Sequence, residues 1–167
     1  MDANDYQSLV EKKDLATLVG YETLRDLLLP ELLGDNPDIL YWAGKKLARE
    51  FNLARDEDLP IFFHQAGWGT LERLKAHQQK QLFKVSGPIV ALRLKKNAEF
   101  QLEAGFLAET IQNQLGFVAE AIIKNQDLRH GSVTILVQQD PEDPIDLALI
   151  PNKSTLHLTE NGVQKIE

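Results

Sequence analysis

The stretch EAGFLAETIQNQLGFVAEAIIKNQDLRHGSVTILVQ, residues 103–138, decides the fold class. As far as Leu115, small and apolar residues recur at steps of three and four, which is the period of an amphipathic helix. From Phe117 onward, residues alternate between two faces with a period of two, which is typical of a strand. The stretch therefore predicts a helix over 103–115, strands over 117–124 and 132–138, and a connection over 127–131.

The residues before this stretch predict three further helices. The first begins near Gly20 and carries leucines at three- and four-residue steps, with Pro30 inside the pattern, where proline kinks or ends a helix. The segment Gly34–Pro37 separates it from a second helix. The buried stripe of this helix consists of five apolar residues: Leu40, Ala43, Leu47, Phe51 and Ala54. A third helix, short and apolar, is predicted over Pro60–Gly67.

Residues 70–86 fit both a helix and a pair of strands. A helical step runs from Leu71 to Leu82, and the residues between them are mostly good helix formers. In the strand reading, Leu74 and Ala76 share one face, and a polar turn leads to a second strand over 81–86. Propensity alone favours the helix, so the residues themselves leave this segment open.

Composition and charge exclude several classes of protein. The chain has 167 residues, 43% of them apolar, which is enough for one domain with a core of its own. It has no cysteine, which excludes a disulfide scaffold, a thiol nucleophile and a cysteine-ligated metal site. The net charge of −7 argues against a nucleic-acid-binding protein. No run approaches the roughly 20 apolar residues of a membrane helix, and the acidic first residues do not resemble a signal peptide, so we expect a cytoplasmic protein without a membrane span.

The positive charge is concentrated in one segment. From Arg73 to Lys96 there are seven basic residues and no acidic one. Such a segment suits an acidic partner, an anionic ligand or an anionic membrane surface. The commoner alternative is a solvated hairpin face, and a third is internal pairing with the acidic N-terminal part of the chain.

The sequence contains no motif for metal binding, phosphate binding or nucleophilic catalysis. The histidines form no close pair and no HExxH motif; they are His64, His77, His130 and His157. We therefore expect no metal and no cofactor. Glu72 and Glu103 are the candidates for a carboxylate pair, but such acids more often cap a helix or form a salt bridge. We expect a protein that is not an enzyme, with catalysis by these two residues as a remote alternative.

Phe106 lies on the polar side of the helix predicted over 103–115. At 100° per residue, its ring is about 150° away from the apolar stripe, beside Thr110 and Asn113. A large ring in this position needs a cover, which is a second layer of the fold, a partner subunit or a ligand. A similar choice between core and pocket wall applies to a second aromatic group: Phe62, Phe63 and Trp68.

Two motifs resemble those of a known family: GWGTLE at 67–72 and FQLEAGFLAE at 100–109. Three shorter segments fit the same family, at 20–26, 40–45 and 85–88. The sequence resembles the YslB-like family of uncharacterised proteins from Gram-positive bacteria over residues 18–140. Because the matching segments are spread in order along the chain, the resemblance is specific for family membership.

That family is in turn similar to the 4-vinyl reductase-type domains and to the small subunits of the TRAPP vesicle-tethering complex. The resemblance implies an α/β (α+β) fold, in which N-terminal helices precede a strand hairpin, a long helix and a second hairpin, with four antiparallel strands in one sheet. It favours strands over 70–77 and 81–86, with 88–94 as a connecting turn. The expected organisation has three parts: a lead-in over 1–19, one ligand-binding-like domain over 20–140, and a loosely attached tail over 141–167.

The resemblance also implies a module that binds a small hydrophobic molecule or assembles with a second copy. The cysteines with which relatives bind metal or carry an acyl group are missing here, so those functions do not transfer. For a ligand, the expected contacts are aromatic rings and one polar group: Phe62, Phe63, Trp68, Phe106, Phe117 and, as the polar contact, His64. For a homodimer, the expected interface is Phe106 with Thr110 and Asn113, or the first two helices.

Overall fold

The structure is a computed structural model that describes residues 1–12, 17–34, 36, 38–77, 79–146 and 155–163. The helices, in chain order, are α1 (Ala3–Val10), α2 (Leu18–Glu22), η1 (Thr23–Leu28), α3 (Leu29–Leu33), α4 (Asp38–Phe51), α5 (Asp58–Gln65), α6 (Pro88–Lys95) and α7 (Gln101–Leu115). The strands are β1 (Thr70–His77), β2 (Lys80–Ser86), β3 (Phe117–Asp127), β4 (Ser132–Pro144), β5 (Leu158–Thr159) and β6 (Gly162–Val163).

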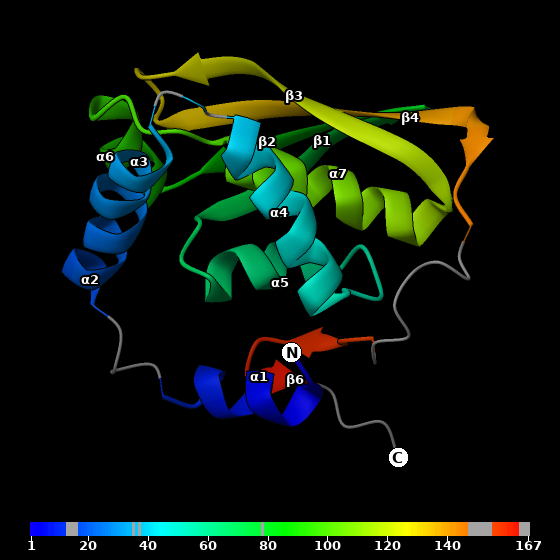
Figure 1. The fold of residues 1–167 in the computed structure, drawn as a ribbon, viewed down its shortest axis with the longest axis horizontal. Helices are drawn as coiled ribbons and strands as arrows, with labels where there is room; N and C mark the ends of the chain where they lie inside the picture. The colour runs from blue at the N-terminus through cyan, green and yellow to red at the C-terminus, as the bar shows by residue number, and fades with distance from the viewer. Residues whose placement is uncertain (13–16, 35, 37, 78, 147–154, 164–167) are drawn as a thin grey trace.

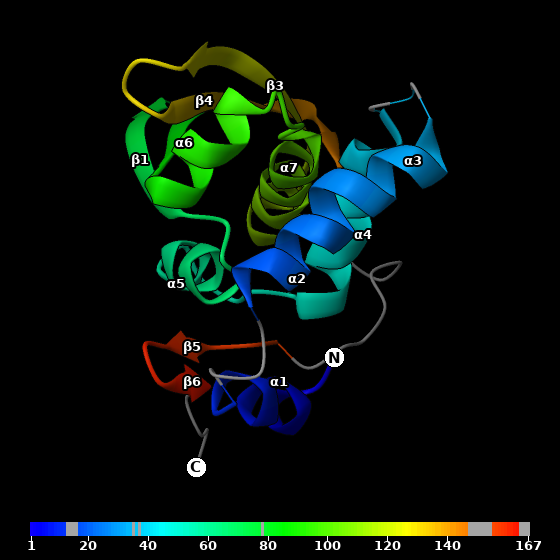
Figure 2. The ribbon, with the colours of Figure 1, turned by 90° about the vertical axis from the view of Figure 1, so that its left-hand side faces the viewer.

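Strands β1 to β4 form one antiparallel sheet in the order β1-β2-β4-β3, so the two hairpins meet where β2 pairs with β4. The register pairs Phe83 with Ile135 and Val85 with Val133, and these side chains are buried on one face of the sheet. Helix α7 lies under that face, with α4 and α5 below it, whereas no described helix covers the opposite face (Figure 1, Figure 2). This arrangement confirms the expected α/β fold with one four-stranded antiparallel sheet.

Helices α4 and α7 cross with their backbones in close contact, because both have glycine at the crossing. A Cβ atom on Gly44 would lie 2.8 Å from the backbone nitrogen of Phe106 and would overlap the carbonyl oxygen of Leu102. A Cβ atom on Gly105 would lie 2.8 Å from the carbonyl carbon of Tyr41. The two glycines therefore allow α7 to lie between the sheet and α4.

The edges of the sheet are protected against pairing with another chain. Along β3, the Tyr41 hydroxyl accepts a hydrogen bond from the backbone N–H of Ala121, and Lys45 Nζ donates to the backbone oxygen of Ala119 at 3.2 Å. At the other edge, the register of β1 shifts after Arg73, which marks a bulge. Covered edges and bulges both disfavour edge-to-edge association.

The segment over 70–86 forms strands β1 and β2, which confirms the strand reading that residue preferences left open. Helix α7 and strands β3 and β4 also occur where the sequence predicts them, although each extends further than expected.

The connecting turn expected over 88–94 is wrong, because these residues form α6. Pro88 begins the helix, and its fixed φ angle suits the first helical position. Val90 and Leu94, four residues apart on one side of α6, are buried, and α6 packs against β2 and β4. Burial of these two side chains stabilises a helix where a turn would leave them exposed.

The first predicted helix forms three consecutive helical segments, α2, η1 and α3. Segment η1 is a π-helix, in which the backbone N–H of Leu29 bonds to the oxygen of Leu24, five residues back. The wider turn leaves room for the ring of Pro30, which in a regular helix would clash with the carbonyl four residues back. We call Leu18–Leu33 the leucine segment. Pro37, which the sequence places before the next helix, lies outside the described residues.

Helix α1 packs against β6 below α5, which differs from the expected lead-in and loosely attached tail (Figure 1). Gln7 of α1 accepts a hydrogen bond from the backbone N–H of Val163 at 2.8 Å. Leu158 is buried, and its backbone N–H donates to Asp58 Oδ1 at 2.8 Å. Two side chains of the tail, Leu156 and Leu158, therefore belong to the core.

Candidate functional site

The leucine segment has its apolar face toward solvent. Its large exposed side chains have between 45% and 76% of their surface accessible: Leu18, Val19, Leu24, Leu27, Leu28 and Leu32. A surface helix normally buries its apolar stripe and exposes its polar side. The leucine segment has the reverse arrangement. The sequence predicts an amphipathic helix here, but only the structure shows which face is outside.

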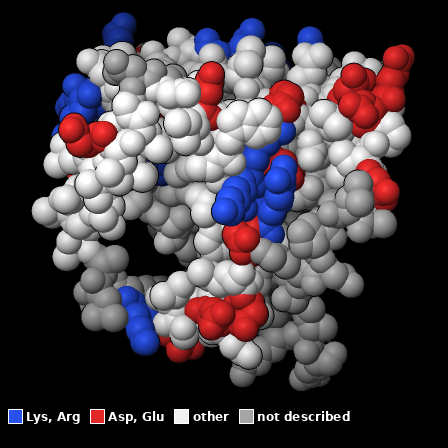
Figure 3. Space-filling model, in the orientation of Figure 1, with Lys and Arg blue, Asp and Glu red and all other residues white. Residues whose placement is uncertain are grey.

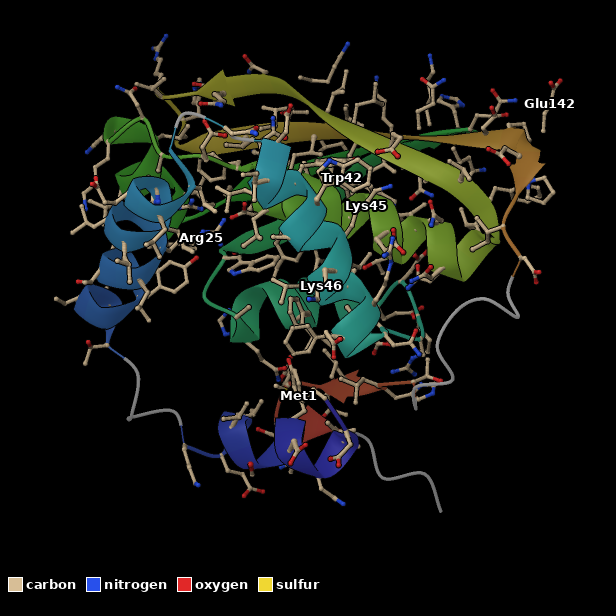
Figure 4. All side chains as sticks on the ribbon, in the orientation of Figure 1. Met1, Arg25, Trp42, Lys45, Lys46 and Glu142 are labelled. Carbon is tan, nitrogen blue, oxygen red and sulfur yellow. The ribbon has the colours of Figure 1, made fainter. Side chains whose placement is uncertain are left out.

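The opposite side of the leucine segment carries charged residues that are buried against α6 and α7 (Figure 4). Arg25 Nη2 lies 2.6 Å from Glu103 Oε2, and Arg93 Nη1 lies 2.8 Å from the other oxygen of the same carboxylate. Arg93 Nε also lies 2.8 Å from Asp26 Oδ2. We call these four residues the buried charge network. Removing one partner from a buried ion pair is strongly destabilising, so the network fixes the charged side of the segment inward.

Arg25 links the buried charge network to aromatic residues. Its guanidinium carbon lies 5.3 Å from the centre of the Trp68 ring, and its Nη1 donates a hydrogen bond to Tyr21 Oη at 2.9 Å. Burial raises the pKa of the Tyr21 phenol, and the nearby charge of Arg25 acts in the opposite direction. Tyr21 therefore stays neutral at physiological pH, and its oxygen accepts the hydrogen bond from Arg25.

Four of the rings proposed as ligand contacts lie together and pack against one another. The rings of Phe62 and Phe106 stack with their centroids 4.5 Å apart and 8° between their planes. Trp68 meets Phe106 edge-on at 5.3 Å, and Phe63 makes edge contacts with both. All four side chains are buried. We call these four residues the ring cluster; it provides the second layer of the fold that covers Phe106.

The burial of α7 corrects the expectation that Phe106, Thr110 and Asn113 form an interface. Phe106 has no exposed surface, Thr110 is 2% exposed, and Asn113 is half-buried. A second subunit cannot contact the first two side chains in this structure. The sequence pattern suggested one polar face on α7, but the helix is buried on all sides as far as Ile111.

The other two expected ligand contacts lie apart from the ring cluster. His64 is exposed on α5 and lines a surface groove together with Gln65 and Glu160. Phe117 is half-buried at the start of β3 and pairs with Pro144 of β4. Contact of any of these side chains with a ligand stays a prediction.

A small apolar cavity adjoins the ring cluster where α1 meets α4 and α5. It has a volume of about 200 Å³ and a mainly apolar lining that includes Tyr6, Leu9, Phe51, Phe62 and Ala66. The Tyr6 hydroxyl donates a hydrogen bond to Gln65 Oε1 at 2.7 Å. Burial raises the pKa of Tyr6, which therefore stays neutral. The cavity suits a small neutral molecule.

The two carboxylates considered for catalysis lie on opposite sides of the sheet. Glu72 pairs with Lys84 on the exposed face, whereas Glu103 is buried on α7 beneath the other face. The fold does not bring them together, which corrects the expected pairing. Among the described residues, no group of three or more His, Asp or Glu side chains is placed to hold a metal ion. Within the same ranges, no helix has the length and apolar character needed to cross a membrane.

The basic segment over 73–96 is divided between paired and unpaired side chains. Three of its basic residues have carboxylate partners: Arg73 with Asp56, Arg93 with Asp26 and Glu103, and Lys96 with Glu22. In the described part of the chain, no carboxylate forms a salt bridge with three lysines of the sheet: Lys75, Lys80 and Lys84. Internal pairing therefore accounts for only part of this segment.

Sequence reasoning missed the buried charge network. The signal was present, because Glu22, Arg25 and Asp26 follow helical spacing on the side opposite the leucines. The partners could not be deduced, since Arg25 and Glu103 are 78 residues apart in the chain. The sequence allows Glu103 to be a catalytic group, a helix cap or a salt-bridge partner. The structure shows that it is a salt-bridge partner.

Comparisons with known proteins agree with this fold. The sequence model of a family described as "Protein of unknown function (DUF2507)" matches residues 18–138. "Uncharacterized protein YslB" of Bacillus subtilis (strain 168) is 44% identical over 129 residues, which are 75% of this chain and 86% of that protein. A crystal structure of a vinyl-4-reductase family protein from Methanocaldococcus jannaschii is similar with a TM-score of 0.63 and 17% identity, over 83% of this chain and 90% of the other. The last likeness concerns the fold alone, whereas the first two confirm the expected resemblance: the chain is similar to YslB and belongs to the DUF2507 family.

Proposed function

We propose that this protein is an interaction module that pairs with a second copy of itself through the apolar face of the leucine segment. The observation that carries the proposal is the reversed orientation of this segment. Its charged side is held inward by the buried charge network, and its leucines are therefore kept exposed. Large exposed apolar patches typically mark interaction sites.

The charge of this face favours a second copy as the partner. Within the leucine segment, Arg25 is buried and Glu31 is the exposed charged residue. The side of the molecule that carries α2 and α3 accordingly shows few charged atoms (Figure 3). Anionic membranes attract faces rich in lysine and arginine, which this face is not. An isologous dimer brings the same patch together from both subunits, and a nearly uncharged apolar patch meets its own copy without repulsion.

The size of the patch is sufficient for a dimer interface. Six large apolar side chains that are about half to three-quarters exposed are comparable with the largest apolar patches of monomers, about 300–600 Å². A standard interface buries about 800 Å² on each partner. A polar rim around the apolar patch provides the area that the patch itself does not. Two-fold pairing of the leucine segments fits these dimensions.

The double substitution Leu24→Glu with Leu27→Glu tests the dimer. Both side chains are at least 60% exposed, so the folded monomer loses little packing. We expect the wild type to be a dimer at micromolar concentration and the variant to dissociate with a Kd at least about 30-fold higher, the size of one hot-spot loss. Sedimentation velocity measures both Kd values.

Leu128→Glu is the matched control, because Leu128 is 60% exposed on the β3–β4 connection and outside the leucine segment. It should leave the dimer intact. A monomeric wild type, or a double variant that remains dimeric, would contradict the proposal.

We propose binding of a small apolar molecule as a second candidate function. The observation that favours it is the cavity of about 200 Å³ beside Phe51 and Phe62. In this proposal Phe62 is the part of the ring cluster that lines the cavity, and α1 contributes Tyr6 and Leu9 to the lining. His64 and Phe117 lie outside the cavity lining, so the proposed contacts are those of Phe62 and its neighbours.

Thermal unfolding with indole and with octanoic acid tests this second candidate. Binding to the folded state alone raises Tm, by several degrees when the ligand concentration is far above Kd. Ala66→Leu is designed to fill the cavity from its own lining and should abolish the rise. Neither compound raising Tm, or an equal rise in Ala66→Leu, would count against the cavity as a binding site.

A further inference from the structure

The face of the sheet that none of the described helices covers has an apolar row at its centre. Leu82 of β2 pairs with Leu136 of β4, which in turn pairs with Ile122 of β3, so the three side chains are neighbours across three strands. Ile122 is 57% exposed, and the other two are half-buried. A groove of about 450 Å³ adjoins the row on β3 and β4. Ile122 and Leu136 line it together with Glu120 and Asp140, whereas Leu82 lies outside its lining.

Three lysines surround one end of this row. Lys80 and Lys84 flank Leu82 on β2 at two-residue spacing, which places all three side chains on the same face of the strand. Lys75 pairs directly with Leu82 from β1. Lys and Arg atoms are visible along the upper border of the molecule, where the sheet lies (Figure 3).

The charges around the row are asymmetric. At the β3 end, Glu120 is neutralised by Lys45, whose Nζ lies 2.8 Å from Glu120 Oε1. At the β1–β2 end, the three lysines have no salt-bridge partner among the described residues, although the chain as a whole is acidic. Glu72 stands opposite Lys84 and partly offsets one of the three charges. An excess of positive charge therefore remains beside the exposed apolar row.

We propose that this open sheet face binds an acidic protein segment. Its apolar side chains would cover the row from Leu82 to Ile122, and its carboxylates would pair with Lys75, Lys80 and Lys84. Complementary charges at the rim of an apolar contact increase the association rate and fix the register of the partner. This inference concerns a different surface from the leucine segment and does not depend on the dimer.

The same face is poorly suited to nucleic acid and to a membrane. Single-stranded nucleic acid stacks its bases on aromatic rings, and on this face the positions paired with Lys80, Leu82 and Lys84 carry no Phe, Tyr or Trp. Binding to anionic lipid uses clusters of about four to eight basic residues, whereas three lysines lie at the β1–β2 end of this row, and Asp140 borders the groove. An acidic protein segment with apolar side chains fits both the charge and the row.

The experiment is selection of a random dodecapeptide phage library on the immobilised full-length protein, followed by fluorescence anisotropy with the selected peptides as synthetic probes. We expect peptides that combine Asp or Glu with Leu, Ile or Phe. Their affinity should fall at least about tenfold in the triple variant Lys75→Glu, Lys80→Glu, Lys84→Glu, and also in Ile122→Ser. Binding should weaken as salt is raised, because exposed charges are screened.

Lys46→Glu is the matched control, since Lys46 is exposed on α4, away from the sheet face (Figure 4). It should leave peptide affinity unchanged, and circular dichroism should show that every variant is folded. Selected peptides without acidic residues, or peptides that bind the triple variant as tightly as wild type, would overturn the proposal. Sedimentation with phosphatidylserine vesicles tests for binding to a membrane instead. If the wild type binds the vesicles and the triple variant does not, this face is a membrane-binding face, and the proposal is equally overturned.

Discussion

Gly105→Ala is expected to destabilise the protein by at least about 3 kcal/mol, the upper end of the cost of overpacking a core. The added methyl group would overlap the carbonyl oxygen of Tyr41 and would lie 3.2 Å from the backbone nitrogen of Lys45. Both obstacles are backbone atoms of α4, so no side-chain rotation relieves the overlap. The two helices must separate, and α7 would lose its contact with the layer below it.

Urea denaturation followed by circular dichroism measures this loss as a change in the free energy of unfolding. Gly20→Ala is the control, because Gly20 is also helical but its nearest neighbour is the Thr17 hydroxyl at 3.3 Å, on an exposed side chain that can move. This control should change the free energy by no more than about 1 kcal/mol, the usual difference between Gly and Ala in a helix. Equal effects of the two substitutions would contradict the close contact between the backbones of α4 and α7.

The sequence predicts elements well where one local pattern determines them. The alternation from Phe117 to Ile123 and from Val133 to Val137 is enough for the β3–β4 hairpin, because the partners are neighbours in the chain. Residues 70–86 were undecided, since most side chains of β1 are exposed and show no apolar alternation. There the family resemblance, rather than a local pattern, predicted the strands.

The candidate site was less predictable because its orientation depends on distant partners. Helical periodicity placed leucines on one side of the segment that begins near Gly20, and the general rule puts such a side inward. The rule fails here because Glu103 and Arg93 offer buried charged partners to Arg25 and Asp26. The sequence likewise does not determine what covers Phe106, since Phe62, which stacks on it, is 44 residues away in the chain.

Glu103→Gln is the second substitution with a large expected effect, about 3–5 kcal/mol of destabilisation, which is the cost of breaking a buried ion pair. Glu103 has no exposed surface and accepts hydrogen bonds from Arg25 at 2.6 Å and from Arg93 at 2.8 Å. Glutamine has nearly the same shape but no charge. Arg93 would keep Asp26 as a partner, whereas Arg25 would remain buried without a carboxylate.

The control for this substitution is Asp56→Asn, which removes a surface salt bridge with Arg73. Hydrogen bonds from Arg73 lower the pKa of Asp56, so this pair stabilises the fold at neutral pH and loses its effect as the pH falls through the lowered pKa. Because Asp56 is about half exposed, the loss at pH 7 should be no more than about 1 kcal/mol. Urea denaturation at pH 7 compares the two variants.

Glu103→Gln also separates a structural role of the network from its proposed role in assembly. If the network holds the leucine segment in its reversed orientation, amide hydrogen exchange in residues 18–33 should accelerate more than in β2 or β4, and the dimer should weaken. The pair of substitutions Arg25→Met and Glu103→Leu removes both charges and should recover much of the stability, because an apolar pair of similar volume replaces a buried ion pair at little cost. If Glu103→Gln costs less than about 1 kcal/mol, or if exchange rises evenly over the chain, then the charges do not keep the leucines outside. The exposed face would then have to be explained by the packing of the helices alone.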